Sequence, residues 1–143
     1  WSREATREVR AALQQGGDHS VRLSAGRLLC QLAQHLRGFV SKPAAHTQLV
    51  LLSAHDTSIF MMLNAFAYDG QSADDWPPHT SSIAIELLED KTIRVLYQLE
   101  PIQFNGSTVQ PLETFLQRLD ALSLTEDEHS SSGNQGAVFK WSD

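Results

Sequence analysis

The chain has 143 residues, of which 41% are hydrophobic and 20% are charged, and its formal net charge is -6. This length suits one domain with a real core, and the composition is that of a globular chain, neither disordered nor fibrous. The acidic balance argues against nucleic-acid binding, which depends on clustered Lys and Arg. No apolar stretch in the sequence approaches the roughly 20 residues of a membrane-spanning helix.

The cysteine and histidine content limits the metal and disulfide sites that the chain can form. A single cysteine, Cys30, excludes an internal disulfide framework and a four-cysteine zinc site. Because Cys30 falls within a helical apolar pattern, we predict that it is a small buried side chain. The six histidines are scattered along the chain, and we predict neither a metal nor a cofactor.

The first part of the chain predicts two helices and a buried strand. A polar helix is expected over Ser2–Gln15, ending at Gly16-Gly17. A stronger apolar stripe from Ser20 to Leu36 predicts an amphipathic helix that Gly38 ends. The continuous apolar run Leu49–Leu52 predicts a strand buried on both faces, as in a parallel sheet.

The remainder predicts a helix, a hairpin and another helix. Asp56 stands where the N-cap of the next helix belongs. Alternating apolar residues predict an antiparallel hairpin around a turn at Glu89–Lys91. Asn105-Gly106 marks a further turn, and Pro111 is expected at the first position of a helix that reaches Leu122. Together these elements predict an α/β fold with a mixed central sheet flanked by helices.

The residues between the predicted strand and the next helix have the strongest chemical character. In open α/β sheets, ligands bind at the carboxyl ends of strands, and a helix N-terminus there favours a phosphate. His55 can donate to phosphate oxygens, and Asp56 can act as a general acid if its surroundings raise its pKa. The spacing also allows a plain role, in which Asp56 only caps the helix and His55 only ends the strand.

Several motifs in this part of the chain resemble those of the histidine acid phosphatases, a branch of the histidine phosphatase superfamily. Residues 51–59, Leu-Leu-Ser-Ala-His-Asp-Thr-Ser-Ile, resemble the His-Asp signature of that family. Residues 76–87, from Trp-Pro-Pro to Glu-Leu, resemble the segment that follows it, and the hairpin and the Pro-Leu-Glu-Thr-Phe run at 111–115 come in the expected order. The resemblance covers roughly Ser20 to Leu119. It implies a phosphoglycerate-mutase-like fold that is incomplete in this chain.

The resemblance also implies a role for each of the two site residues. Family members hydrolyse phosphomonoesters through a phosphohistidine and require no metal. By this resemblance, His55 binds the phosphoryl group and Asp56 protonates the leaving alcohol. The nucleophilic histidine of the family lies in an Arg-His-Gly-x-Arg-x-Pro motif, which these 143 residues lack. We therefore expect the chain by itself to be inactive.

From the resemblance we expect residues 1–125 to be the C-terminal part of a catalytic domain. We expect residues 126–143 to be a mobile tail that is acidic and rich in Ser and Gly. The chain begins at Trp1 without a methionine or a signal-peptide pattern, and we expect it to be a piece of a longer protein. The expected partners are a phosphomonoester substrate, the missing N-terminal half and a second copy of the chain, but no nucleic acid. Family habit favours a secretory, lysosomal or membrane-associated location.

Four other residues are candidates for a role. Trp76 and His79 flank Pro77-Pro78 and are candidate substrate-pocket residues, against the plainer roles of a packing anchor and a solvated histidine. Glu86 matches the Glu-Leu position, where we expect a buried, hydrogen-bonded structural role. Asn105 begins an Asn-Gly-Ser sequon and is a glycosylation candidate on a secretory route, although Asn-Gly is also a common turn.

Two functions of other classes stay open at this point. A degenerate family member would keep the fold and a phosphate pocket without the nucleophile, as a non-catalytic binding or regulatory module. A structural domain would instead use an exposed sheet edge to pair with another copy. The sequence that precedes these residues, together with phosphate binding that depends on His55, tests the first alternative, and self-association tests the second.

Overall fold

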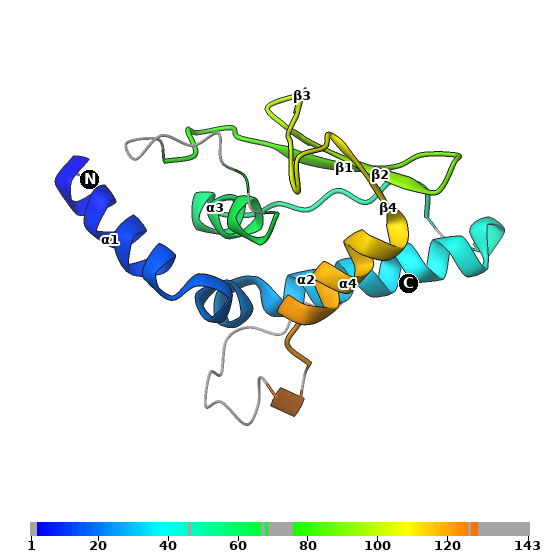
Figure 1. Cartoon of the computed structure of the whole chain (residues 1–143), viewed down its shortest axis with the longest axis horizontal. Coiled ribbons are helices and arrows are strands. Elements are labelled where there is room, and N and C mark those ends of the chain that lie inside the picture. Colours follow the sequence, from blue (N-terminus) through cyan, green and yellow to red (C-terminus); the bar gives the residue numbers. More distant parts are fainter. Residues whose placement is uncertain (1–2, 46, 67, 69–75, 126, 129–143) are drawn as a thin grey trace.

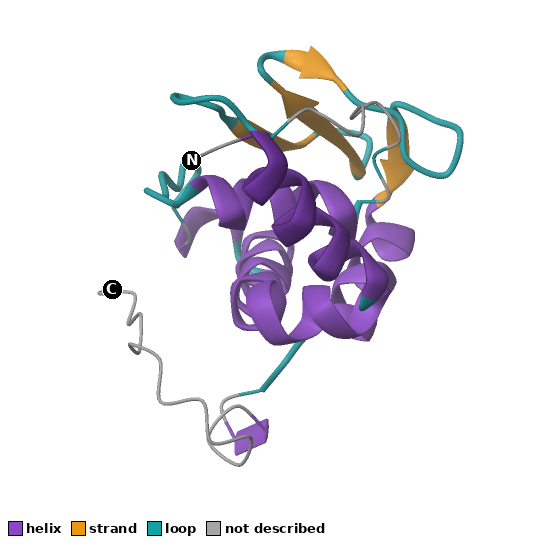
Figure 2. Ribbon diagram, turned by 90° about the vertical axis from the view of Figure 1, so that its left-hand side faces the viewer, coloured by secondary structure: helices purple, strands orange, loops and turns teal. Residues whose placement is uncertain are grey.

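The computed structural model describes residues 3–45, 47–66, 68, 76–125 and 127–128. Within these ranges it contains four α-helices and a four-stranded open sheet packed against them. This arrangement confirms the α/β prediction. Figure 2 shows the helices gathered on one side of the sheet. The core therefore lies between a helical layer and a sheet layer.

The chain opens with two helices, α1 over Arg3–Gln15 and α2 over Gly17–Ser41, which meet at an angle (Figure 1). The predicted break at Gly16-Gly17 is confirmed, because Gly17 adopts a φ of +50°, a conformation that glycine reaches without steric cost. The predicted end at Gly38 is wrong. The Lys42 N–H donates to the Gly38 carbonyl at 3.0 Å and closes one more turn, after which Pro43 cannot continue the helix. A short 3-10 turn, η1 (Pro43–Ala45), follows.

The sheet is built around its second strand. Its strands are β1 (Ile83–Leu87), β2 (Thr92–Tyr97), β3 (Glu100–Pro101) and β4 (Val109–Pro111). β2 pairs with β1 along one edge and with β3 and β4 along the other. The predicted hairpin is confirmed, with Ile85 opposite Val95. The predicted turn at Asn105-Gly106 is also confirmed, since both residues have positive φ, as a tight hairpin turn requires.

The described part of the chain has no strand at Leu49–Leu52, where a buried strand was predicted. Leu49 is 71% exposed and Leu51 is 84% exposed, so the prediction of burial is wrong. An apolar run becomes a buried strand only where neighbouring strands bond its backbone and other elements cover both faces. Every pairing among the described strands is antiparallel. The parallel component of the predicted mixed sheet is therefore not found in them.

Two further helices complete the helical layer, α3 over Asp56–Ala65 and α4 over Leu112–Leu122. The predicted apolar face of α4 is confirmed, with all five of its residues buried: Leu112, Phe115, Leu116, Leu119 and Leu122. Pro111 is not the first helical residue as predicted but directly precedes the helix and ends β4. α4 lies beside α2 (Figure 1), and the Phe115 ring contacts the rings of Phe66 and Phe104 at the centre of the core.

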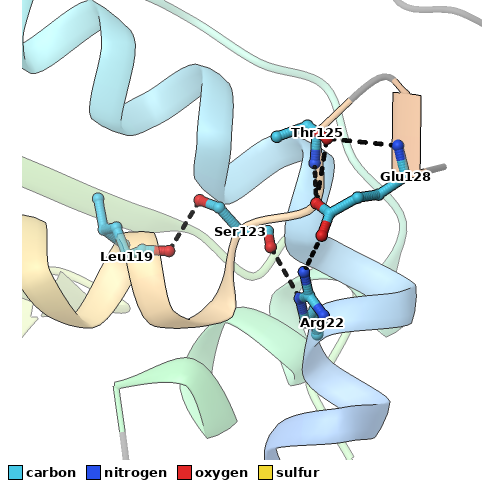
Figure 3. A network of polar contacts seen from close by, with 5 residues as sticks. All are labelled: Arg22, Leu119, Ser123, Thr125 and Glu128. Carbon is cyan, nitrogen blue, oxygen red and sulfur yellow. Dashed lines mark hydrogen bonds and ion pairs between the residues drawn. The ribbon is translucent and has the colours of Figure 1, made fainter.

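The segment after α4 is tied to α2 by polar contacts (Figure 3). The Arg22 Nε donates to the Ser123 carbonyl at 2.9 Å, and an Arg22 Nη2 pairs with the Glu128 carboxylate at 2.5 Å. Thr125 and Glu128 bond each other's backbone N–H groups, in the manner of a capping box. Of the tail predicted at 126–143, only residues 127–128 are described, so its predicted mobility lies outside the described residues.

Candidate functional site

His55 and Asp56 lie where an extended segment passes into α3. His55 has an extended backbone (φ -81°, ψ 160°), and its carbonyl accepts hydrogen bonds from the N–H groups of Ser58 and Ile59 at 3.0 and 3.2 Å. His55 is therefore the N-cap residue. Asp56 was predicted at that position but is the first residue of the helix. The one-residue difference follows from the backbone, because the helical conformation begins only after His55.

The Asp56 side chain still bonds a donor at the start of the helix. Its Oδ1 accepts the backbone N–H of Thr57 at 2.7 Å. The first turn of a helix leaves N–H groups without partners inside the helix and carries the positive end of the helix dipole, which favours a carboxylate there. His55 and Asp56 are both exposed, so both side chains are accessible to a solute.

Trp76 lies in the loop before β1, 20 residues after Asp56, and contacts the Asp56 carboxylate. Its Nε1–H donates to Asp56 Oδ2 at 2.6 Å. Its ring stacks on that of Phe60, with centroids 5.0 Å apart and an interplanar angle of 18°. Phe60 is fully buried and lies one helical turn after Asp56, on the same side of α3. Trp76 thus links the hydrophobic core to the candidate site.

A buried arginine of α1 lies against the same aromatic side chain. The guanidinium carbon of Arg10 is 5.7 Å from the centroid of the Phe60 ring, within the range of a cation–π interaction. Arg10 is only 6% exposed, whereas Arg7 on the same helix is exposed. No local spacing in the sequence separates these two arginines, so only the packing of α1 distinguishes Arg10.

The surroundings of Asp56 lower its pKa. The hydrogen bond from the Trp76 indole is the largest cause, and the Thr57 N–H and the charges of His55 and His79 act in the same direction against a desolvation that raises it. A raised pKa is the condition under which Asp56 would act as a general acid near neutral pH. In this structure that condition is not met. Asp56 is ionised at neutral pH and accepts hydrogen bonds.

The other residues singled out from the sequence lie apart from the His55–Asp56 pair or only border it. His79 is exposed in the loop before β1, and its charge acts on Asp56. Glu86 is hydrogen-bonded as expected, to Arg94 on the adjacent strand at 2.6 Å, but its side chain is 40% exposed, so the expected burial is wrong. An edge strand leaves room for this pair to face water. Asn105 is exposed at its turn.

Cys30 is partly buried in α2 and is not the fully buried side chain that was predicted. The Gln34 Nε2 lies 3.5 Å from its Sγ, one turn along the helix. The neighbouring Leu29 is fully buried. The apolar stripe therefore points Leu29 into the core and leaves Cys30 at its margin.

Within the described ranges, no three His, Cys, Asp or Glu side chains gather into a group that could hold a metal ion. No helix found in those ranges is long and apolar enough to cross a membrane. Comparison of the chain with protein-family models gave no match, and comparison with curated proteins gave none either.

Proposed function

We propose that this chain carries the His-Asp half of a phosphomonoesterase site of the histidine acid phosphatase type. The observation that carries the proposal is the position of His55 and Asp56, consecutive and exposed at the first turn of α3. In this proposal His55 binds the phosphoryl group, and the protonated form of Asp56 donates a proton to the leaving alcohol. The described elements then form part of a phosphoglycerate-mutase-like domain. A companion segment bearing the Arg-His-Gly-x-Arg-x-Pro motif supplies the nucleophile.

The chemistry of the two side chains makes the proposed function dependent on pH. A histidine side chain and the positive end of a helix dipole both favour a phosphate. The ionised Asp56 carboxylate opposes the approach of a phosphate, because two like charges repel. Acid conditions reduce the charge on the phosphate and so weaken this repulsion. We therefore expect phosphate to bind more tightly in acid than at neutral pH.

A second candidate function is a non-catalytic phosphate-binding or regulatory module. The lowered pKa of Asp56 favours it, because an ionised carboxylate cannot donate a proton to a leaving group. Both candidates predict phosphate binding through His55. They differ once the companion segment is supplied, since only the phosphomonoesterase then releases phosphate from an aryl phosphate.

The test is a titration of the chain with inorganic phosphate at about pH 5, followed through the imidazole resonances. We expect a saturable shift of the His55 signal. His55→Ala should weaken binding by about 10- to 100-fold, as loss of a charged hydrogen bond of roughly 1.5–3 kcal/mol implies. The control is His19→Ala, which removes an exposed histidine on α2 and should leave binding unchanged. Binding that survives His55→Ala, or no saturable shift in the wild type, contradicts both candidate functions.

A further inference from the structure

We propose that Trp76 is a positioning residue that holds the Asp56 carboxylate in one orientation at the start of α3. A role for this contact in catalysis rests on the proposed function, whereas the contact between Trp76 and Asp56 does not. The sequence alone left two general roles open for Trp76, as a residue of the substrate pocket or as an anchor that packs against the core. The structure combines an anchored ring with a directed N–H group, and this combination defines the more specific role.

Two donors from different segments fix the two oxygens of the carboxylate. The Trp76 Nε1–H bonds Oδ2 at 2.6 Å, and the Thr57 backbone N–H bonds Oδ1 at 2.7 Å. An ionised carboxylate has about four lone-pair sites, so two remain for the hydroxyl or protonated oxygen of a ligand. Rotation of the carboxylate about its Cβ–Cγ bond would break both hydrogen bonds. The free lone pairs therefore keep a constant direction.

The core fixes the position of Trp76 itself. Its ring stacks on the fully buried Phe60 at 5.0 Å, and the next residue, Pro77, is buried as well. Arg10 approaches the Phe60 ring from α1. A stacked aromatic pair is more stable than the apolar area it buries accounts for. The indole N–H is thus held in place before any ligand arrives, which reduces the cost of ordering the carboxylate during binding.

The Trp76 hydrogen bond is the largest cause of the lowered pKa of Asp56, and nearby charges add to it. His55 at the N-cap of α3 and His79 on the loop both act on Asp56, and Arg10 on α1 faces the Phe60 ring. Because the folded pKa of Asp56 is lowered, the stabilising effect of the contact is fully present above the pKa of an unfolded Asp. It is lost as the pH falls through the lower folded value. We expect the contact to be closed at neutral pH and to open only in strong acid.

The decisive experiment is a carboxyl NMR titration of Asp56 in the wild-type chain and in Trp76→Phe. The Phe ring can still stack on Phe60, but it lacks the N–H donor together with the second ring of the indole. We expect the Asp56 titration midpoint to move to higher pH in Trp76→Phe, while the resonances of the core residues stay in place. An unchanged midpoint with an unchanged core would overturn the proposal.

A second measurement follows the indole directly. The sequence has three tryptophans, so Trp1→Phe and Trp141→Phe leave Trp76 as the only tryptophan, which can be excited selectively over the two tyrosines. Its fluorescence should then change with pH at the Asp56 midpoint, and Asp56→Asn should abolish that change. A pH response that persists in Asp56→Asn would contradict the contact. Neither measurement uses phosphate, so a shifted midpoint without phosphate binding would retain the positioning contact and reject the proposed function.

Discussion

Gly26 is the residue at which α2 allows another segment to approach its backbone. Its carbonyl accepts the N–H of Leu124 at 3.1 Å. A Cβ added at Gly26 would lie 2.8 Å from the Leu124 Cβ and 2.9 Å from the Leu122 carbonyl oxygen. Backbone atoms cannot move aside as a flexible side chain can. The glycine is therefore required for the contact between α2 and the segment that follows α4.

We predict that Gly26→Ala destabilises the chain. Ala gains about 1 kcal/mol over Gly in a helix, but overpacking costs about 1–3 kcal/mol, so we expect a net loss of up to about 2 kcal/mol. Urea unfolding measures the difference. Ser24→Ala is the matched control, because Ser24 is exposed on the same helix. A Gly26→Ala chain that is as stable as Ser24→Ala would show that the segment after α4 moves away freely.

At the residue scale the sequence singled out the His55–Asp56 pair and named Trp76 and His79 as candidate pocket residues, but it did not predict the contact between Trp76 and Asp56 or the position of Arg10. His55 and Asp56 are adjacent in a motif, so a linear pattern is sufficient to find them. Trp76 is 20 residues from Asp56, and Arg10 lies on another helix. Contacts of this kind depend on how the elements pack. The lowered pKa of Asp56 likewise follows from the Trp76 hydrogen bond, which no sequence pattern contains.

Arg118 of α4 joins three helices at the element scale. It makes a two-pronged ion pair with Asp18 at the start of α2, at 2.9 and 2.8 Å, and its Nε donates to the Ala65 carbonyl at the end of α3. The hydrogen bonds from Arg118 hold the pKa of Asp18 below its ordinary value. Because Asp18 is 65% exposed, solvent screening keeps the contribution of the pair to at most about 1 kcal/mol.

The ion pair between Arg118 and Asp18 makes the stability of the fold depend on pH, and the variant Asp18→Asn tests this dependence. A carboxylate with a lowered folded pKa stabilises the fold above its unfolded pKa and ceases to do so as the pH falls through the folded value. The wild type should therefore be slightly more stable than Asp18→Asn near pH 7, and the difference should vanish in strong acid, below the lowered folded pKa of Asp18. Urea unfolding at both pH values measures it, with Glu100→Gln on exposed β3 as the control. A difference that stays constant with pH would exclude the ion pair as its origin.

The elements that the sequence predicted well are those whose own pattern is sufficient. The hairpin and α4 show a clear period of two and of 3.6 residues, and each needs only one face covered. Leu49–Leu52 shows the opposite case, because a run that is apolar on both faces depends on neighbours that the pattern does not supply. Pro43 ended α2 where Gly38 did not, since proline removes a hydrogen-bond donor and glycine only weakens the helix.

At the scale of the whole molecule, the exposed apolar segment at Leu49–Leu52 is the main departure from a self-contained fold. The segment is uncharged, and no backbone hydrogen bond among the described residues involves it. β1 is paired on one edge only within the same described ranges. Open edges and exposed apolar strands both favour pairing with another chain.

We predict that the chain associates with a second copy through this segment. Leu51→Glu should reduce association by placing a charge in the middle of the segment. Sedimentation velocity over a range of concentrations measures it. Leu99→Glu is the control, since Leu99 is also exposed but lies in a turn outside the segment. A wild type that remains monomeric at every concentration, or an equal effect of Leu99→Glu, would refute the role of the segment.

The sequence by itself determined the α/β class, the order of the helices and the hairpin, and the two residues at the start of α3. Local periodicity and a contiguous motif encode these features, because each depends on residues that are close along the chain. Only the tertiary structure decided that Asp56 is ionised, that Trp76 and Phe60 hold it, and that Leu49–Leu52 is exposed. Each of these depends on which distant groups surround a residue, and packing alone determines those surroundings.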